Sequence, residues 1–318
     1  MENKDLISIQ VPIYNVSKYV DKCLKSIQNQ TYDNFEVLMI LDHADDYADL
    51  EIAKKYAESD KRFKLIVPHF EKQGIAITRN YCLSLATGKY MTYIDGDDSV
   101  SPVYLENLHN AIIKDDADLA ICSYKRSKYN IKLDKTIAKK IKRFDKQEIL
   151  CRLFSSNKIG GFLWNKLYRT EVAKQIEFNP EYKLGHDLFW CFEYISKCEK
   201  INLIDKKLYH YLIRPGSEVT AKGVSKWLTF LNAMNEVIER TNKDEKVLAC
   251  AKTWRGVLTV LAYFRAKKML PQKKILRNIL ATYIKEGKVA LKHNKYITWY
   301  HKLYLKYAYH VSKGDLLW

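Results

Sequence analysis

The chain has 318 residues and a hydrophobic fraction of 47%, which is the composition of an ordinary globular protein with one large or two modest domains. The polar first residues are not followed by the apolar core of a signal peptide, and no apolar run approaches transmembrane length, which argues against a secreted or membrane-spanning protein and predicts a cytoplasmic one. The net charge of +17 is uneven, because residues 221–318 contain 20 Lys and Arg against 6 Asp and Glu, which gives +14 and leaves +3 for residues 1–220.

The first hundred residues alternate between strands and helices. We expect buried strands where apolar residues run together and helices where they recur at helical spacing, with Ser17 as the cap of the first helix. The predicted strands cover residues 6–12, 35–41, 63–67 and 90–94, and the predicted helices cover residues 17–30, 49–59 and 74–86. This alternation favours an α/β domain with a mainly parallel sheet.

Side chains suited to ligand binding follow three of these strands. Pro12 and Tyr14 stand at the end of the first strand, and Asp42 follows the second. Asp95 and Asp97 follow the fourth. Ligands of parallel α/β sheets bind beyond the carboxyl ends of the strands, so we expect these residues to converge on one crevice.

The stretch Asp95-Gly96-Asp97-Asp98 packs three carboxylates around one glycine. Two carboxylates about 4 Å apart repel by roughly 4 kcal/mol at an effective dielectric near 20, so such a run is costly unless a positive group sits there. Carboxylate oxygens suit Mg²⁺ or Mn²⁺, and the glycine would let a ligand approach the backbone. The alternative is an acidic turn that closes a hairpin.

The sequence lacks the glycine-rich loops that bind phosphate in dinucleotide-binding and Walker-type proteins. A diphosphate in this crevice would therefore need a metal ion and cationic side chains. Arg79 and Arg214 are the candidates for neutralising phosphate. The alternative for Arg79 is an ion pair on the surface of its helix.

Further strands and helices are expected downstream. The predictions are a helix at 102–114, a strand at 117–122, a strand pair or exposed loop at 124–146 and a strand at 208–213. A helix begins near Gly185, with His186 and Asp187 in its first turn, where Asp187 could also be a simple N-cap. The seven cysteines are scattered without a CxxC pair, so we expect reduced core thiols and no metal ligands.

From residue 221 onward the chain is predicted to be helical, with Pro271 between two helices. The last helix, at about 293–310, carries apolar side chains on one face and lysines beside them. This pattern fits an interfacial helix on an anionic membrane, whereas the alternative is a helical subdomain whose aromatics pack on the core and whose lysines are solvated. The face consists of Tyr296, Trp299, Tyr300, Leu303 and Tyr307, with Lys295, Lys302 and Lys306 beside it.

With these residues identified, the chain resembles the bacterial family 2 glycosyltransferases of the GT-A fold over about residues 5–220. The resemblance depends on an ordered series of motifs, in which Asp95-Gly96-Asp97-Asp98 is similar to the DxD motif of the family. The other matching segments are residues 8–15, 26–32, 74–80, 86–90, Trp164-Asn165-Lys166-Leu167-Tyr168 and His186-Asp187.

The resemblance implies a Rossmann-like, mixed and mainly parallel sheet flanked by helices in residues 1–220, followed by a basic helical C-terminal subdomain in residues 221–318. It also implies inverting transfer of a sugar from a nucleotide diphosphate, with UDP preferred and Mn²⁺ or Mg²⁺ as cofactor. The implied donor site uses Pro12 in the opening motif, Tyr14 on the base, Asp42 on the nucleoside, Asp95 on the ribose and Asp97 on the metal.

On the acceptor side, the resemblance makes Asp187 the general base and places Trp164, Asn165, Lys166 and His186 around the acceptor. A positioned carboxylate that accepts the proton of an attacking hydroxyl typically contributes 10²- to 10⁴-fold to the rate.

Two positions depart from the family pattern. His43 stands where the family usually has a second aspartate that reads the pyrimidine, and His186 replaces the usual glutamate before the base. A protonated His186 would lower the pKa of Asp187 or help to bind the acceptor, and the sequence leaves both roles open.

The leading hypothesis is a glycosyltransferase at the inner face of the cell membrane that extends a capsule, teichoic acid or other surface glycan, free or lipid-linked. One alternative is the same chemistry on a glycoprotein or adhesin. Another is a non-catalytic module for polyanions or nucleic acid, which does not explain the converging acids, so no nucleic acid partner is expected. A monomer and a homo-oligomer are both compatible with the sequence.

Overall fold

The structure, a computed structural model, describes residues 4–41, 47–68, 74–129, 131–155, 159–214, 224–241, 243–270 and 272–316. Two units make up the chain, and each is described by itself. The sheet unit comprises Met1–Lys146, Leu163–Pro180 and Glu193–Thr220, and the helical unit comprises Gln147–Phe162, Glu181–Phe192 and Ala221–Trp318. The sequence expectation placed all of residues 1–220 in one domain, whereas two stretches of that region group with the C-terminal helices.

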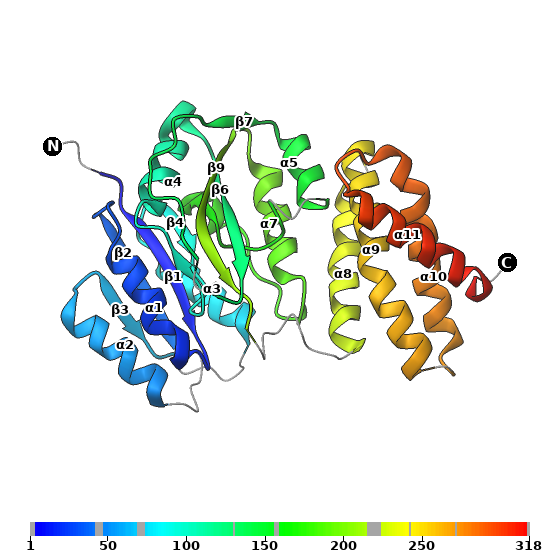
Figure 1. The fold of residues 1–318 in the computed structure, drawn as a ribbon, viewed down its shortest axis with the longest axis horizontal. Coiled ribbons are helices and arrows are strands. Elements are labelled where there is room, and N and C mark those ends of the chain that lie inside the picture. The colour runs from blue at the N-terminus through cyan, green and yellow to red at the C-terminus, as the bar shows by residue number, and fades with distance from the viewer. Residues whose placement is uncertain are drawn as a thin grey trace. The chain divides into compact units, whose positions relative to one another are not determined.

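A mixed sheet forms the centre of the sheet unit, and helices flank it (Figure 1). Its strand order is β3-β2-β1-β4-β8-β6-β9-β5, with β7 also paired to β9, and most of the paired residues lie in parallel pairings, as expected. The strands are β1 (Ile7–Ile13), β2 (Phe35–Leu41), β3 (Phe63–Ile66), β4 (Tyr90–Tyr93), β5 (Ser99–Val100), β6 (Leu119–Ser127), β7 (Lys142–Phe144), β8 (Lys166–Arg169) and β9 (Ile201–Leu212).

The helices of residues 17–197 connect or follow these strands. They are α1 (Ser17–Gln28), α2 (Tyr47–Ser59), α3 (Ile75–Leu85), α4 (Tyr104–Ile113), α5 (Lys146–Leu153), α6 (Thr170–Ala173) and α7 (His186–Lys197). The later helices all belong to the helical unit. They are α8 (Val224–Arg240), α9 (Glu245–Met269), α10 (Lys274–Ala290) and α11 (Trp299–Ser312).

The parallel pairing of β1 with both β2 and β4 decides where the site lies. Every residue of β1 except Pro12 is buried, as expected for a central strand covered on both faces. Ile7 pairs with Phe35 of β2 and with Tyr90 of β4, so the three strands run in the same direction. Their carboxyl ends therefore meet at one edge of the sheet, which confirms the expected arrangement for β1 and β4.

Several element boundaries differ from the sequence expectation. Ser17 does not cap α1; it is the first helical residue, and the Asp49 carboxylate accepts from the backbone N–H of Val16 instead, at 3.2 Å. The region 124–146 holds the end of β6 and the short strand β7. β9 begins at Ile201 rather than at residue 208, because it pairs along most of its length with β6.

The last helix begins at Trp299 and not near residue 293. The side chain of Asn294 accepts from the backbone N–H groups of Tyr296 and Ile297 at 3.0 and 3.2 Å. These local hydrogen bonds stabilise a turn in place of a helix, so Tyr296 lies outside α11.

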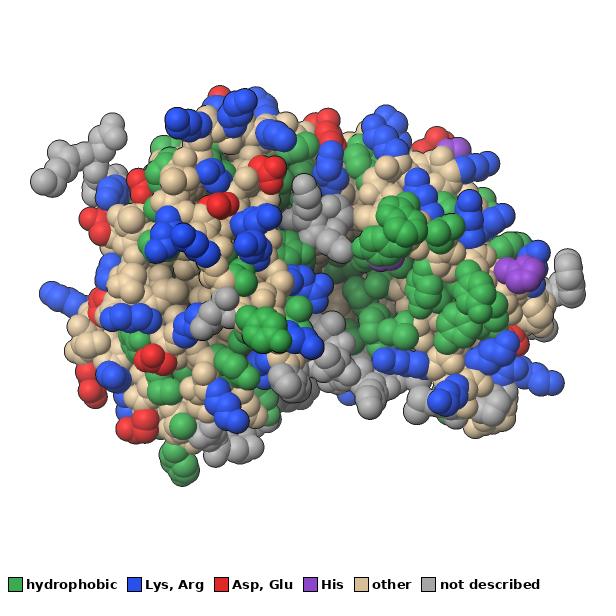
Figure 2. Space-filling view, viewed as in Figure 1, with side chains coloured by type: hydrophobic (Ala, Val, Ile, Leu, Met, Phe, Trp, Pro, Cys, Tyr) green, Lys and Arg blue, Asp and Glu red, His purple; other side chains and the backbone are tan. Residues whose placement is uncertain are grey.

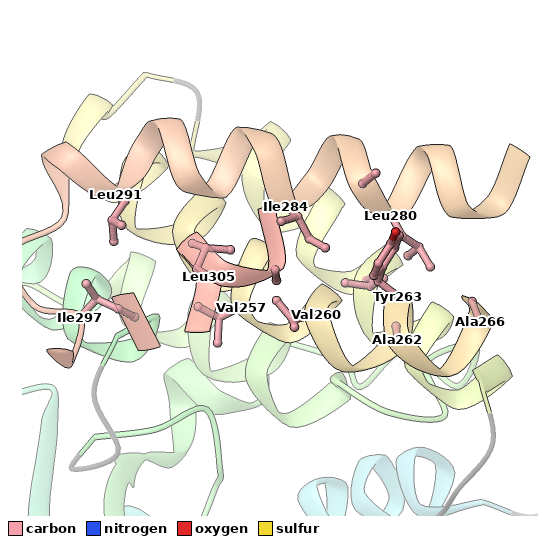
Figure 3. Packing of buried hydrophobic residues seen from close by; sticks show 13 residues of the cluster. Val257, Val260, Ala262, Tyr263, Ala266, Leu280, Ile284, Leu291, Ile297 and Leu305 are labelled. Carbon is pink, nitrogen blue, oxygen red and sulfur yellow. The ribbon is translucent and has the colours of Figure 1, made fainter. Parts of the chain in front are cut away.

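Apolar side chains from α9, α10 and α11 form the core of the helical unit. Figure 3 shows Leu280 and Ile284 of α10 facing Val260 and Tyr263 of α9, with Leu305 of α11 nearby. By length and composition, the stretch Glu245–Lys268 of α9 could cross a membrane, and 67% of its most apolar window is buried within the protein. The sequence expectation missed this stretch because charged residues interrupt the apolar run, and a buried core helix meets the same criterion.

Two glycines let α9 and α10 approach closely. A Cβ atom on Gly287 would lie 2.9 Å from the Cα of Gly256 and 2.9 Å from the carbonyl oxygen of Lys252. Both neighbours are backbone atoms, which cannot move aside as a flexible side chain can. The crossing of these helices therefore depends on the absence of side chains at positions 256 and 287.

Replacing Gly287 with valine is expected to destabilise the helical unit by about 1–3 kcal/mol, the usual cost of overpacking a core. The measurement is urea unfolding followed by circular dichroism. Gly314→Val is the matched control, because a Cβ at Gly314 meets nothing within 4 Å, so its free energy of unfolding should stay within about 0.5 kcal/mol of the parent. Equal unfolding midpoints for the two variants would contradict this account of the crossing.

All seven cysteines are buried as thiols, in agreement with the sequence prediction. Burial raises the pKa of Cys122 and of Cys198 well above its usual value, because a thiolate is poorly stabilised away from water. In the folded protein these thiols are therefore inert.

Candidate functional site

The acidic residues after β4 form a closed turn. The backbone N–H of Asp98 donates to the carbonyl oxygen of Asp95 at 2.9 Å. The next strand, β5, pairs with β9 and not with β4, so the turn does not close a hairpin. The hairpin alternative is therefore wrong, and the carboxylates stand at the carboxyl edge of the sheet.

The end of β1 lies directly beside this turn. A Cβ atom on Gly96 would be 2.9 Å from the carbonyl oxygen of Pro12, so only glycine allows this approach. Tyr14, two residues after Pro12, has a side chain that is 53% exposed. The next residue, Asn15, adopts a positive φ of 50° that turns the chain. Pro12 and the acidic turn thus converge as predicted, whereas Asp42 and His43 lie outside the described residues.

Two arginines face the acidic turn from different elements. The Nε of Arg214, just after β9, lies 2.5 Å from Oδ2 of Asp97. A guanidinium nitrogen of Arg79, on α3, lies 3.9 Å from Oδ1 of Asp95. Arg79 is buried, with its guanidinium 5.7 Å from the ring centroid of Phe178, so it is not a residue of the helix surface. Both arginines therefore lie beside the carboxylates of the acidic turn.

Asp98 differs from its two neighbours because it is buried. Its carboxylate accepts from the hydroxyl of Tyr209 and from the backbone N–H of Leu212, both at 2.7 Å. Burial, together with the charges of Asp95 and Asp97, raises the pKa of the Asp98 carboxyl well above its usual range. Asp98 thereby fastens the acidic turn to β9, a positioning role that sequence reasoning missed.

The acidic turn suits a divalent cation that a substrate helps to bind. The side chains of Asp95 and Asp97 are 28% and 19% exposed and offer hard oxygen ligands. Among the described residues there is no group of three or more His, Cys, Asp or Glu side chains that could hold a metal. Mg²⁺ sites typically use one or two carboxylates together with substrate phosphates, so the donor set fits such a cation bound together with a diphosphate.

The predicted acceptor-side residues 164–166 lie inside the sheet unit. The Trp164 ring stacks on Tyr209 with centroids 4.7 Å apart and planes at 12°. Asn165 has a positive φ of 63° and donates to the carbonyl oxygen of Cys122 at 2.5 Å, and its Oδ1 accepts from Lys166 Nζ at 3.0 Å. All three side chains are buried, and the Trp164 ring packs on the Tyr209 ring whose hydroxyl bonds Asp98 of the acidic turn. Their predicted place around the acceptor stays a prediction.

His186 and Asp187 belong to the helical unit, at the start of α7. α7 begins at His186, so Asp187 lies in its first turn and is not the N-cap. Gly185, just before the helix, has a φ of 90°. His186 Nε2 is 2.9 Å from Asp187 Oδ1, and His186 Nδ1 is 3.2 Å from the carbonyl oxygen of Tyr182. Both ring nitrogens therefore face oxygen acceptors, and both contacts are satisfied as hydrogen bonds when the ring carries two protons.

Gln10 is a further polar residue that sequence reasoning missed. It lies in the middle of β1, beside Tyr93 of β4, and is 1% exposed. Within the part of the chain that the structure describes, neither polar atom of its amide has a hydrogen-bond partner. The only signal in the sequence is one amide among the aliphatic residues of a central strand.

Comparison with known proteins relates this arrangement to a family. The family model described as "Glycosyl transferase family 2" matches residues 8–176. The putative glycosyltransferase EpsH of Bacillus subtilis is 35% identical over 219 residues, which are 67% of this chain and 62% of EpsH. The minor teichoic acid biosynthesis protein GgaB of the same organism is 26% identical over 76% of this chain and 27% of its own length. The chain thus spans less than two thirds of these relatives.

Solved structures share the fold over nearly the whole chain. Staphylococcus aureus TarS 1–349, determined in complex with UDP, has a TM-score of 0.70 at 20% identity, over 97% of this chain and 88% of that one. The mannosyltransferase PcManGT from Pyrobaculum calidifontis, determined with GDP-Man and Mn²⁺, has a TM-score of 0.56 at 12% identity, over 98% and 89%. The fold is GT-A-like, with a mixed sheet and C-terminal helices. By its sequence motifs, its sheet and the match to the family model, the chain belongs to glycosyl transferase family 2.

Proposed function

We propose that this protein is an inverting glycosyltransferase that moves a sugar from a UDP-sugar to a hydroxyl group of a surface glycan. The observation that carries the proposal is the acidic turn at residues 95–98, which faces two arginines at the carboxyl edge of parallel strands. The complex of TarS with UDP supports the choice of nucleotide, and the teichoic acid role in the name of GgaB supports the class of acceptor.

The donor would bind along the edge formed by β1 and β4. The ring of Tyr14, which is 53% exposed, would stack on the base, and Asp95 would bind the ribose. Asp42, directly after β2, would contact the nucleoside. Arg214 and Arg79 would turn from their carboxylate partners toward the phosphates, since guanidinium groups bind both anions with similar geometry.

Asp97 would hold Mn²⁺ or Mg²⁺ against the diphosphate. Such an ion stabilises the negative charge that grows on the nucleoside diphosphate as its bond to the sugar breaks. Asp98 keeps the Asp97 carboxylate in place through its two hydrogen bonds to β9. The Mn²⁺ complex of PcManGT, a distant structural neighbour, supports this choice of cofactor.

Asp187 would act as the general base. The acceptor hydroxyl attacks the anomeric carbon on the face opposite the departing diphosphate, its proton passes to the Asp187 carboxylate, and the configuration at that carbon inverts. His186 contacts the same carboxylate at 2.9 Å and would fix its orientation.

The direct test measures nucleoside diphosphate release from UDP-glucose, UDP-galactose, UDP-N-acetylglucosamine and GDP-mannose in the presence of Mn²⁺. We expect release of UDP from at least one UDP-sugar and loss of this activity when EDTA removes the metal. Calorimetric titration with UDP gives a second readout that does not require turnover. Failure to bind UDP with Mn²⁺, or release that EDTA leaves unchanged, would overturn the proposal.

A further inference from the structure

α11 presents an apolar surface to solvent. Its buried side chains, including Leu305 and Ala308, pack on the core of the helical unit. Another face of the same helix, which we call the α11 patch, carries side chains at spacings of one, four, five and eight residues that are 41–73% exposed. The α11 patch consists of Trp299, Tyr300, Leu303, Tyr304 and Tyr307.

The surroundings of the α11 patch are positively charged. Between residues 287 and 314 the sequence contains six lysines and neither Asp nor Glu. Lys302 and Lys306 lie within the helix, and Figure 2 shows hydrophobic side chains gathered over α11 with Lys and Arg around them. An exposed apolar patch with a cationic rim marks a site of interaction and not an ordinary solvated surface.

We propose that the α11 patch binds an anionic lipid surface. Helices that lie in the membrane interface combine Trp, Phe or Leu on one face with Lys or Arg beside it, and each basic residue near the surface contributes about 1 kcal/mol. Lysine side chains there can rest their methylene groups on the apolar boundary while the ammonium groups reach the lipid headgroups. The protein would thus be held at the inner face of the cell membrane, where lipid-linked acceptors are found.

Two other occupants fit the observations less well. A second copy of this chain would bring two lysine-rimmed patches together, which like charges oppose. A soluble polyanionic glycan would use the lysines, but sugars stack on flat aromatic platforms, whereas the rings of Trp299 and Tyr300 stand at 88° to each other. Leu303, 57% exposed, also offers nothing that a glycan would recognise.

The test is flotation of the full chain with vesicles of phosphatidylglycerol and phosphatidylcholine, compared with vesicles of phosphatidylcholine alone. We expect binding to the anionic vesicles only, and its loss at high salt. The variant Lys302→Glu with Lys306→Glu should bind at least roughly 30-fold more weakly, because it loses two basic residues that each contribute about 1 kcal/mol to binding. The variant with Trp299→Ser, Leu303→Ser and Tyr307→Ser should bind at least about tenfold more weakly.

Matched controls come from the sheet unit. Tyr47→Ser with Tyr129→Ser removes two aromatic side chains that are 81% and 78% exposed, and Lys139→Glu with Lys140→Glu makes an equal change of charge. Both controls should float like the parent, and all variants should release UDP from soluble UDP-sugars at the parental rate, which separates this inference from the proposed function.

Three outcomes would overturn the proposal. The first is a parent protein that does not float with anionic vesicles, or α11 patch variants that float as well as the parent. The second is a parental dimer, seen by sedimentation, that the patch substitutions convert to a monomer. The third is a serine variant that loses binding to a soluble polyanion, such as dextran sulfate, to the same extent as it loses binding to anionic vesicles.

Discussion

Replacing Asp187 with asparagine is expected to lower the rate of sugar transfer by about 10²- to 10⁴-fold, the usual contribution of a positioned general base. Asparagine is nearly isosteric and can still accept a hydrogen bond from His186, which lies 2.9 Å away, but it cannot take the proton of the acceptor hydroxyl. The measurement is transfer to an acceptor glycan, with UDP binding followed by calorimetry. Donor affinity should stay near the parental value, because Asp187 is assigned to the acceptor side.

Glu193→Gln is the matched control for this experiment. It removes one carboxylate from the same helix, α7, six residues further along. It should transfer sugar at the parental rate. A variant at position 187 that turned over like this control would show that another group accepts the proton.

Replacing Asp97 with asparagine is expected to weaken donor binding in Mn²⁺ by at least about tenfold, since even groups that only support a metal ligand typically cost 10- to 100-fold in metal affinity. The amide oxygen can still accept from Arg214, so the change removes the charge of the proposed metal ligand and keeps the local hydrogen bond. In EDTA, the parent and the variant should bind UDP equally. The measurement is calorimetric titration with UDP with and without Mn²⁺.

Asp205→Ala provides the comparison for position 97. Asp205 lies on β9 of the sheet unit, is exposed, and accepts a hydrogen bond from the hydroxyl of Ser123 at 3.0 Å. Its removal should leave the Mn²⁺ dependence of UDP binding intact. If the Asp97→Asn protein still gained affinity from Mn²⁺ to the parental extent, the metal would have to bind elsewhere.

The elements around the site were predictable because their signals are local. β2 was predicted with its observed bounds, since six of its seven residues are apolar and the run ends at a cluster of polar residues. The adjacency of Pro12 and the acidic turn followed from the rule that parallel strands present their carboxyl ends together. Neither prediction needed knowledge of distant contacts.

The remaining features depend on contacts between distant segments. Asp98 is distinguished from Asp95 and Asp97 by its burial and by its bonds to β9, more than 110 residues away. The burial of Asn165 and Lys166 likewise follows from the antiparallel pairing of β6 with β8. Three aspartates of the same turn therefore have different environments because of tertiary packing. The pattern of apolar and polar residues along the sequence does not predict such packing.

The aromatic face of the last helix illustrates the same limit. From the sequence, packing of these side chains on the core and exposure at an interface were both open. In the structure, Leu305 and Ala308 pack against the other helices, and this leaves Trp299 and Tyr307 exposed to solvent.

Because every cysteine is buried, the reactivity of the thiols can report on local unfolding of the chain. A thiol-alkylating reagent added to the native protein meets no accessible sulfur and marks only molecules that have transiently unfolded. Cys23, Cys82, Cys122 and Cys198 mark the sheet unit, and Cys151, Cys191 and Cys250 mark the helical unit. Peptide mapping by mass spectrometry of the alkylated positions would therefore reveal which half of the molecule opens first.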